Sequence, residues 1–363
     1  MAIIRTLINW FKGNKMPLNP TTLAVPGVGS FRGINPNLDI VLATLTGAGG
    51  QQINSRVDLA TAVTDTTNKG FILLKRRNAA GNWSWNPNYT DTNTADLASP
   101  SCYFINDDTA LPGVRAQQVQ TINTTGCIVN NVNPAGDYVF YFIREQRAIG
   151  WFTTYSYTGQ PAPIFMNPLL GGTDVTKHLP GIIISKHSDT TNIDAPEWYV
   201  HHRTLGATQV FFLNNNGAAN TSNAFNNFLP TLTQWSVAGN NNFNTNIYRA
   251  YIFADNKTSD GNSCVGSYVG NGNIVGPVNF CGWKPDIVII KANAARNWAV
   301  FDRPRGIIGA ANDPEMQFNL QNAETATKDI GIDTKNFQVR TTNIDVNELG
   351  TTYYWWALRW QDR

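Results

Sequence analysis

The sequence repeats one pattern of strand-like runs three times. Three short apolar runs each end in a lysine, and each is followed by a tryptophan and, much later, by a run of aromatic residues. The spacing from the lysine to the matched aromatic residue is 66, 65 and 65 residues for the pairs Lys75 and Tyr141, Lys186 and Tyr251, and Lys291 and Trp356. Similarity at a fixed spacing is typical of tandem modules. The sequence therefore predicts an N-terminal arm at 1–37 and three repeats, at 38–147, 148–261 and 262–363.

The predicted fold class is all-β. The apolar runs are short and rich in Ile, Val, Phe and Tyr, and Gly, Asn and Pro separate them, which is typical of strands and turns. The 44 Asn and 37 Thr residues suit turns and pleated strands, respectively. A propeller blade would have only about 40–50 residues. We therefore expect three tandem β-sandwiches, each with its own apolar interior, and we expect the recurring Trp83, Trp198 and Trp298 to fill these interiors.

The N-terminal arm contains the one amphipathic helix that the sequence predicts. Ile3, Ile4, Leu7, Ile8 and Phe11 fall on one helical face, and Pro17 prevents the helix from continuing. A helix this short is marginal in water by itself, so its apolar face should pack against something. Packing on the first repeat, docking on a partner protein and binding to a membrane surface all stay open. For partner docking, the candidate residues are Ile4, Leu7, Ile8 and Phe11.

Composition and motifs exclude several classes of function. Charged residues make up only 14% and the net charge is +2, so nothing favours a nucleic-acid partner. No apolar run has the roughly 20 residues that membrane insertion requires. Four cysteines fit two disulfides or four thiols. No nucleophile, phosphate-loop or zinc motif occurs, and His178, His187, His201 and His202 are interpreted as loop or surface residues. We therefore expect no enzyme activity, no cofactor and no metal.

Two sets of residues are candidates for ligand binding. Trp83, Trp85 and Tyr89 lie among asparagines, and aromatic faces flanked by amides suit the stacking of sugar rings. In the segment from Asp302 to Gly306, Asp302 and Arg305 fit either a ligand site or a structural turn in which the carboxylate accepts hydrogen bonds and Gly306 takes an unusual dihedral.

The third repeat carries the motif that is most specific. It runs Ser267-Tyr268-Val269-Gly270-Asn271-Gly272, then Gly282-Trp283-Lys284-Pro285-Asp286 into an aliphatic strand ending at Lys291, then Trp298 and Asp302-Arg303-Pro304-Arg305-Gly306. This pattern resembles an uncharacterised concanavalin-like domain that is repeated in bacteriophage tail-fibre and other virion proteins. The second repeat keeps part of the pattern but has His201-His202-Arg203 in place of the last turn, and the first repeat is the most divergent.

The resemblance implies a lectin-like jelly-roll sandwich in a virus particle and implies no catalytic residues. We expect a phage virion protein, assembled in the host cytoplasm, that acts as a tail-fibre or receptor-binding component on host surface glycans. A purely structural role, such as a capsid fibre or decoration protein, is the alternative. A polysaccharide depolymerase is the third, with Asp302, Asp313 and Glu315 as candidate acids. The helix would dock on other virion proteins, and fibre analogy favours a homotrimer.

Overall fold

The structure, a computed structural model, describes twelve stretches of the chain. They are residues 38–47, 50–57, 59, 70–88, 102–106, 118–130, 133–145, 150–171, 178–187, 197–243, 245–307 and 312–359. The predicted N-terminal helix, with Ile4, Leu7, Ile8 and Phe11, lies outside these residues. Within them the chain is all-β, as predicted, with a single short α-helix, α2 (Ile344–Asn347).

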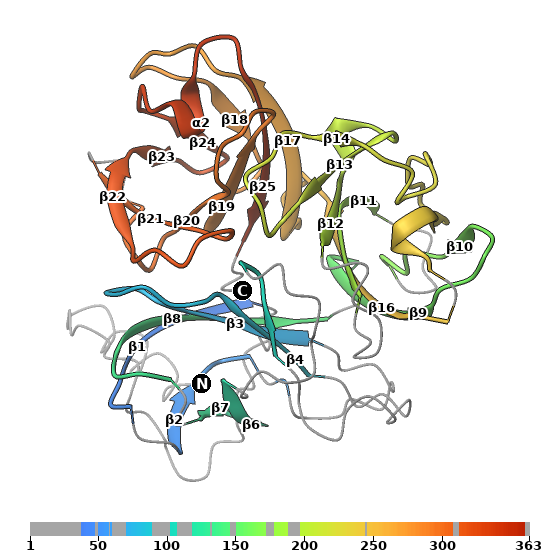
Figure 1. Cartoon of the computed structure of the whole chain (residues 1–363). Helices are drawn as coiled ribbons and strands as arrows, with labels where there is room; N and C mark the ends of the chain where they lie inside the picture. The colour runs from blue at the N-terminus through green and yellow to red at the C-terminus, as the bar shows by residue number, and fades with distance from the viewer. Residues whose placement is uncertain are drawn as a thin grey trace, which may run out of the picture. The chain divides into compact units, whose positions relative to one another are not determined.

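Strands from the first repeat form a large and a small antiparallel sheet (Figure 1). In spatial order the large sheet contains β1 (Leu38–Leu45), β8 (Gly136–Arg144), β3 (Gly70–Arg76), β4 (Ser84–Asn88) and β5 (Tyr103–Phe104). The small sheet contains β2 (Gln51–Asn54), β7 (Gly126–Val129) and β6 (Val119–Asn123). The opening and closing strands of the repeat are therefore neighbours at one edge of its large sheet.

The second repeat contributes a sheet of six strands and a sheet of two. In spatial order the larger contains β14 (Asn220–Thr221), β13 (Gln209–Phe212), β12 (Trp198–His202), β11 (Leu179–His187), β16 (Ile247–Asp255) and β9 (Phe152–Thr158). The smaller pairs β10 (Ile164–Met166) with β15 (Trp235–Val237).

The third repeat contributes sheets of six and three strands. In spatial order the larger contains β17 (Ser263–Val269), β25 (Thr352–Leu358), β19 (Ile287–Ala292), β20 (Ala299–Asp302), β21 (Asp313–Gln317) and β22 (Thr325–Lys328). The smaller contains β18 (Val278–Phe280), β24 (Asn336–Val339) and β23 (Ile330–Ile332).

The three large sheets share one strand order. In each, the opening strand pairs with the closing strand, which pairs with the strand that ends near the lysine, and then the strand after the recurring tryptophan follows. The constant spacing from lysine to aromatic residue reflects the pairing of the closing strand with the strand that ends near the lysine. In these pairings Leu73 lies opposite Tyr141, Ile184 opposite Tyr251 and Ile289 opposite Trp356. Among the described strands, none of one repeat enters a large sheet of another.

Each large sheet is apolar on both faces. Side chains alternate between the faces of a strand, and in β3 Ile72 and Leu74 belong to a cluster made only of first-repeat residues. Phe71 and Leu73, which alternate with them, belong to a cluster with members from all three repeats. The same alternation occurs in β11 and β19. The apolar runs are continuous because both of their faces are buried.

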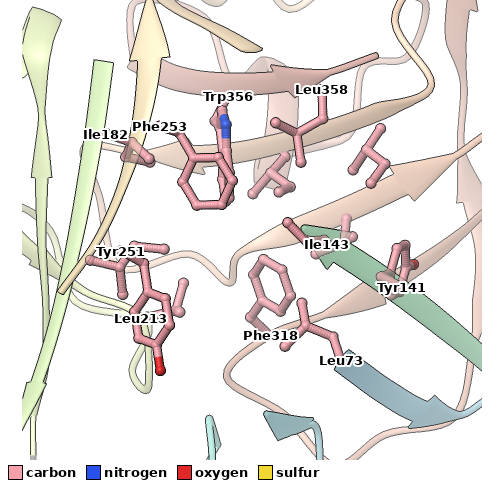
Figure 2. Packing of buried hydrophobic residues seen from close by; sticks show 14 of the residues in the cluster. Leu73, Tyr141, Ile143, Ile182, Leu213, Tyr251, Phe253, Phe318, Trp356 and Leu358 are labelled. Carbon is pink, nitrogen blue, oxygen red and sulfur yellow. The ribbon is translucent and has the colours of Figure 1, made fainter. Parts of the chain in front are cut away.

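The expectation that each repeat hides its own apolar interior is therefore only half correct. Each repeat has such a cluster, but a fourth cluster, which we call the shared cluster, joins the three large sheets. Figure 2 shows members of this cluster from all three repeats, among them Leu73, Phe253 and Trp356. Residues Asn35–Asp362 consequently form one compact unit rather than three.

The recurring tryptophans lie in the shared cluster, not in the separate interiors where we expected them. Each lies where one repeat meets the next. The indole Nε1 of Trp83 donates to the carbonyl of Gln317 at 2.8 Å, and that of Trp298 donates to the carbonyl of Phe212 at 2.9 Å. Trp198 packs against Tyr103 and Trp85 of the first repeat. Its indole N–H has no acceptor among the described residues.

Within the described part of the chain, the indole of Trp298 donates a hydrogen bond and that of Trp198 does not, so replacing each tryptophan by phenylalanine should have unequal effects on stability. Trp298→Phe removes the donor to the Phe212 carbonyl, whereas Trp198→Phe removes a similar volume and no hydrogen bond. A buried polar group that loses its partner costs about 1–3 kcal/mol. We expect Trp298→Phe to lower the free energy of unfolding by about that much more than Trp198→Phe. Chemical denaturation followed by circular dichroism measures both, and equal losses would contradict the assigned hydrogen bond.

Candidate functional site

The tryptophans proposed for sugar stacking are buried. Trp83 and Trp85 are 0% and 1% exposed. Trp85 stacks on Phe71 with ring centroids 4.1 Å apart, and the ring of Trp83 lies 4.7 Å from that of Phe318. The prediction is wrong for these two residues because Trp83 directly precedes β4 and Trp85 lies in it, where side chains on both faces are buried. Tyr89, the third member of the set, lies outside the described residues.

The Asp302 and Arg305 side chains form a fully buried ion pair. Asp302 ends β20, and Arg305 lies in the turn that follows. Nε of Arg305 donates to one carboxylate oxygen of Asp302, and its backbone N–H donates to the other at 3.0 Å. Gly306 continues the turn with φ +123°, a region that favours glycine. The structural-turn interpretation describes this segment, and no ligand can reach either charge while both are enclosed.

This pair belongs to a wider polar network between the first and third repeats. The hydroxyl of Tyr141 donates to Asp302 Oδ2 at 2.6 Å. On the other side, Nη1 of Arg305 donates to Glu324 Oε2 at 3.4 Å. Nε and Nη2 of Arg77 then donate to the two oxygens of Glu324, both at 2.9 Å. Five side chains thus connect β8 and the end of β3 to the third repeat.

The electrostatics of this network keep its members in fixed charge states. Burial raises the pKa of the Tyr141 phenol well above its usual value, so the phenol stays a donor. Burial acts to lower the pKa of Arg305, but the neighbouring Asp302 carboxylate outweighs it, and the pKa lies above the usual value. The hydrogen bond to Glu324 raises the pKa of Arg77. The network therefore braces two repeats rather than transferring protons at neutral pH.

Two of the three lysines that mark the repeats also bridge between repeats. Lys75 and Lys291 are both fully buried. Nζ of Lys75 donates to the carbonyl of Gln321 at 2.8 Å, and Nζ of Lys291 donates to that of Asn216 at 3.3 Å. Burial lowers the pKa of Lys75 to about 8 and that of Lys291 to about 7. Each amine therefore donates to carbonyls of its own and of a neighbouring repeat, and burial shifts its protonation equilibrium toward the neutral form.

The histidines expected at the surface are in fact buried, apart from the half-buried His178. His187 lies in β11, and His201 and His202 lie in β12, each no more than 2% exposed. Nε2 of His202 lies 3.0 Å from the carbonyl of Trp355, and Nδ1 lies 3.1 Å from the hydroxyl of Thr204. Burial lowers the pKa of His202 to about 4 and that of His201 to about 3. His202 is thus neutral at pH 7 and donates across the junction of the second and third repeats.

The described residues contain potential metal ligands and a cavity within the shared cluster. No group of three or more metal-ligating side chains occurs among them. The cavity, of about 20 Å³, is lined by apolar side chains that include Leu73, Ile184 and Ile289. It has room for about one water molecule, and an apolar lining keeps such a space dry. The four cysteines are buried free thiols, so the two-disulfide alternative is wrong.

Exposed apolar side chains gather at one end of the third repeat. They lie at the end of β17, on the loop from there to the edge strand β18, on β18 itself and on the turn before β25, and are Val269, Ile274, Val275, Val278, Phe280 and Leu349. We call this set the third-repeat apolar surface. Asn347 orders it, since its amide donates to the Asn273 carbonyl at 2.8 Å and accepts from the Asn271 backbone at 2.9 Å.

Comparison with known families adds one finding. A family model described as Domain of unknown function (DUF7483) matches residues 169–361, more than half of the chain. The chain belongs to the DUF7483 family. The DUF7483 match includes both partners of the His202–Trp355 contact and the Asp302–Arg305 pair. No curated protein matches the chain. Among the described residues, no helix has the length and hydropathy needed to cross a membrane.

Sequence reasoning missed Tyr141, Arg77 and Glu324 as members of the network. Tyr141 was recognised only as part of an aromatic run, and Arg77 and Glu324 are 247 residues apart in the chain. The low content of charged residues was the available signal, because an isolated Glu in a chain with few charges is expected to pair with a specific cationic side chain. The identity of that partner depends on the packing of the repeats.

Removal of the central arginine tests the network. Arg305→Met leaves the Asp302 carboxylate buried without its cation, which costs about 3–5 kcal/mol. Lys284→Met, at an exposed lysine of the same repeat, removes one charge and should change stability by less than about 0.5 kcal/mol. Urea denaturation of both variants measures the difference. Similar losses in the two would show that the ion pair contributes nothing specific.

The buried histidines predict acid sensitivity. The pKa of His202 is about 4 in the folded chain and about 6.5 when unfolded, so the unfolded state binds more protons between these values. The free energy of unfolding should therefore fall as the pH drops from 6.5 to 4, by about 3 kcal/mol from this residue alone. His202→Gln should flatten the profile in this window. A variant profile as steep as that of the wild type would contradict the assignment.

Proposed function

We propose that the chain is a structural protein of a bacteriophage particle, assembled in the host cytoplasm and built from three tandem copies of one lectin-like jelly-roll module. The recurrence of one strand order in three large sheets supports the tandem origin. The resemblance of the third-repeat motif to virion domains supports the place in a particle. The observation that carries a structural role is the shared cluster, because it joins the repeats into one block.

The motif residues act in the fold itself, which supports this role. Asp286 accepts a hydrogen bond from Arg303 Nη1, and the backbone N–H of Arg303 donates to the Asp286 carbonyl at 2.9 Å. Trp298 and Asp302 make contacts to other repeats. The stretch by which the third repeat resembles virion domains therefore builds and joins modules, and such interlocking suits a durable assembly.

Receptor binding is the second candidate function. Trp83 and Trp85, which first favoured it, are buried, so it now depends on the third-repeat apolar surface, whose ordered loop is exposed as a contact surface requires. A polysaccharide depolymerase has less support. Asp302, Asp313 and Glu315 are at most 1% exposed, and Asp302 and Glu315 pair with Arg305 and Lys328.

The proposal includes docking of the N-terminal segment on other virion proteins and association of copies of the chain. Leu7→Asp places a charge on the predicted apolar face, so the variant should stay folded but be lost from purified phage particles. Thr6→Asp, off that face, is the matched control and should be incorporated. Mass spectrometry of particles measures incorporation. Equal incorporation of the two variants would contradict N-terminal docking.

The place of the protein in the particle separates the two candidate functions. A structural role predicts antibody labelling along the shell, tube or fibre shaft, and purified protein that leaves infection unchanged. Receptor binding predicts labelling at a fibre tip, and purified protein that adsorbs to host cells and blocks infection. Absence of the protein from purified particles would contradict both candidates.

A further inference from the structure

One lysine and two acidic side chains meet inside the third repeat. Lys328 ends the edge strand β22, Glu315 lies in β21 and Asp345 lies in α2. Nζ of Lys328 is in direct contact with Glu315 Oε2 and lies 3.3 Å from Asp345 Oδ2. The Lys328 and Glu315 side chains are 3% and 0% exposed, whereas that of Asp345 is 25% exposed. An amine therefore lies against two carboxylates with little access to water.

The surroundings of this group are apolar. Met316 of β21 belongs to the shared cluster, so the alternation of side chains puts Glu315 on the opposite face, where the cluster of the third repeat lies. Ile330 and Val346, which flank the group in sequence, are both 0% exposed and belong to that cluster. Burial raises the pKa of Glu315, and Lys328 opposes this shift. Burial of this kind favours the protonated form of the Glu315 carboxyl group, which is the form that can donate a proton.

We propose that Lys328 and Asp345 condense to form an intramolecular amide bond, with Glu315 relaying the protons. The Lys328 ammonium gives one proton to Glu315, and the neutral Nζ attacks Cγ of Asp345. The bond from Cγ to one carboxylate oxygen then breaks. That oxygen leaves as water with one proton from Glu315 and one from the attacking amine. An ammonium group and a carboxylate become an amide and water, Glu315 is regenerated, and no other reactant is needed.

The contacts of Lys328 differ from those of two other buried lysines, Lys75 and Lys291. Lys75 and Lys291 donate to backbone carbonyls, which cannot condense with an amine. Lys328 instead meets two carboxylates, of which one can accept the nucleophile and the other can carry protons. The bond would join an edge strand of the large sheet to α2, and it would therefore hold the otherwise unpaired side of β22. This inference does not depend on the proposed function.

The mass of the purified full-length chain tests the proposal directly. Under denaturing conditions, the intact mass should be one water molecule below the value calculated from the sequence. Trypsin should fail to cleave after Lys328, and the digest should contain a branched peptide that joins Lys328 to Asp345. A full calculated mass, or a free Lys328 peptide in a chain that is one water short, would overturn the proposal. The second result would indicate dehydration elsewhere, such as a cyclic imide at Asp345.

Variants separate the roles of the three side chains. Glu315→Gln keeps both reacting groups but removes the proton relay, so most of the chain should have the full mass. Asp345→Ala should have the full mass throughout. Asp345→Asn keeps an electrophilic carbon and should still cross-link, losing ammonia instead of water. Asp333→Asn, at an exposed acid of the same repeat, is the control and should stay one water short. Unchanged water loss in Asp345→Ala would also overturn the proposal. If a variant does not fold, the mass of the wild-type chain still decides whether the amide bond forms.

Discussion

Burial of the large sheets on both faces is the constraint on which the rest of the structure depends. One face of each sheet packs against residues of its own repeat, and the other packs in the shared cluster with the remaining two sheets. Exposure of the second face would bring side chains such as Phe71, Tyr251 and Trp356 into water. Separation of the repeats is therefore opposed by the hydrophobic effect over three sheet faces at once. Residues Asn35–Asp362 consequently form one unit although their strands pair within repeats.

The same constraint determines where polar groups can lie. A charge on a strand that is buried on both faces needs a partner, since an unpaired buried charge is costly. Asp302 meets Arg305, and Arg77 meets Glu324. Lys75 and Lys291 instead have lowered pKa values and donate to carbonyls of the neighbouring repeat. The Arg77–Glu324 pair and both lysines connect two repeats directly, and Tyr141 joins the Asp302–Arg305 pair to the first repeat. The partnering of buried polar groups therefore also holds the repeats together. Surfaces for other molecules are left to loops and edge strands, such as β18.

The sequence predicted the elements much better than their partners. The constant spacing from lysine to aromatic residue was informative because it measures a strand pairing, such as that of Ile289 with Trp356. The alternation of apolar residues, however, shows only that two faces are buried and not what covers each face. For this reason Trp83 was assigned to the wrong cluster and Trp85 to the surface. Tyr141 and Asp302 are 161 residues apart, and their hydrogen bond exists only because separate repeats pack together.

The junctions between repeats differ in ways that give the third repeat a special position. The carbonyl of its Gln317 accepts a hydrogen bond from Trp83 of the first repeat, and its Trp298 donates one to Phe212 of the second. The hydrogen bonds of these two recurring tryptophans therefore both involve the third repeat. Between the second and first repeats, Trp198 makes ring contacts without such a bond. Where the third repeat has its Asp-Arg turn, the second has His202, which contacts Trp355 of the third repeat. The third repeat therefore has polar contacts with both neighbours through the stretch of sequence in which its motif is clearest. Its motif serves the assembly of the whole unit as much as the fold of one module.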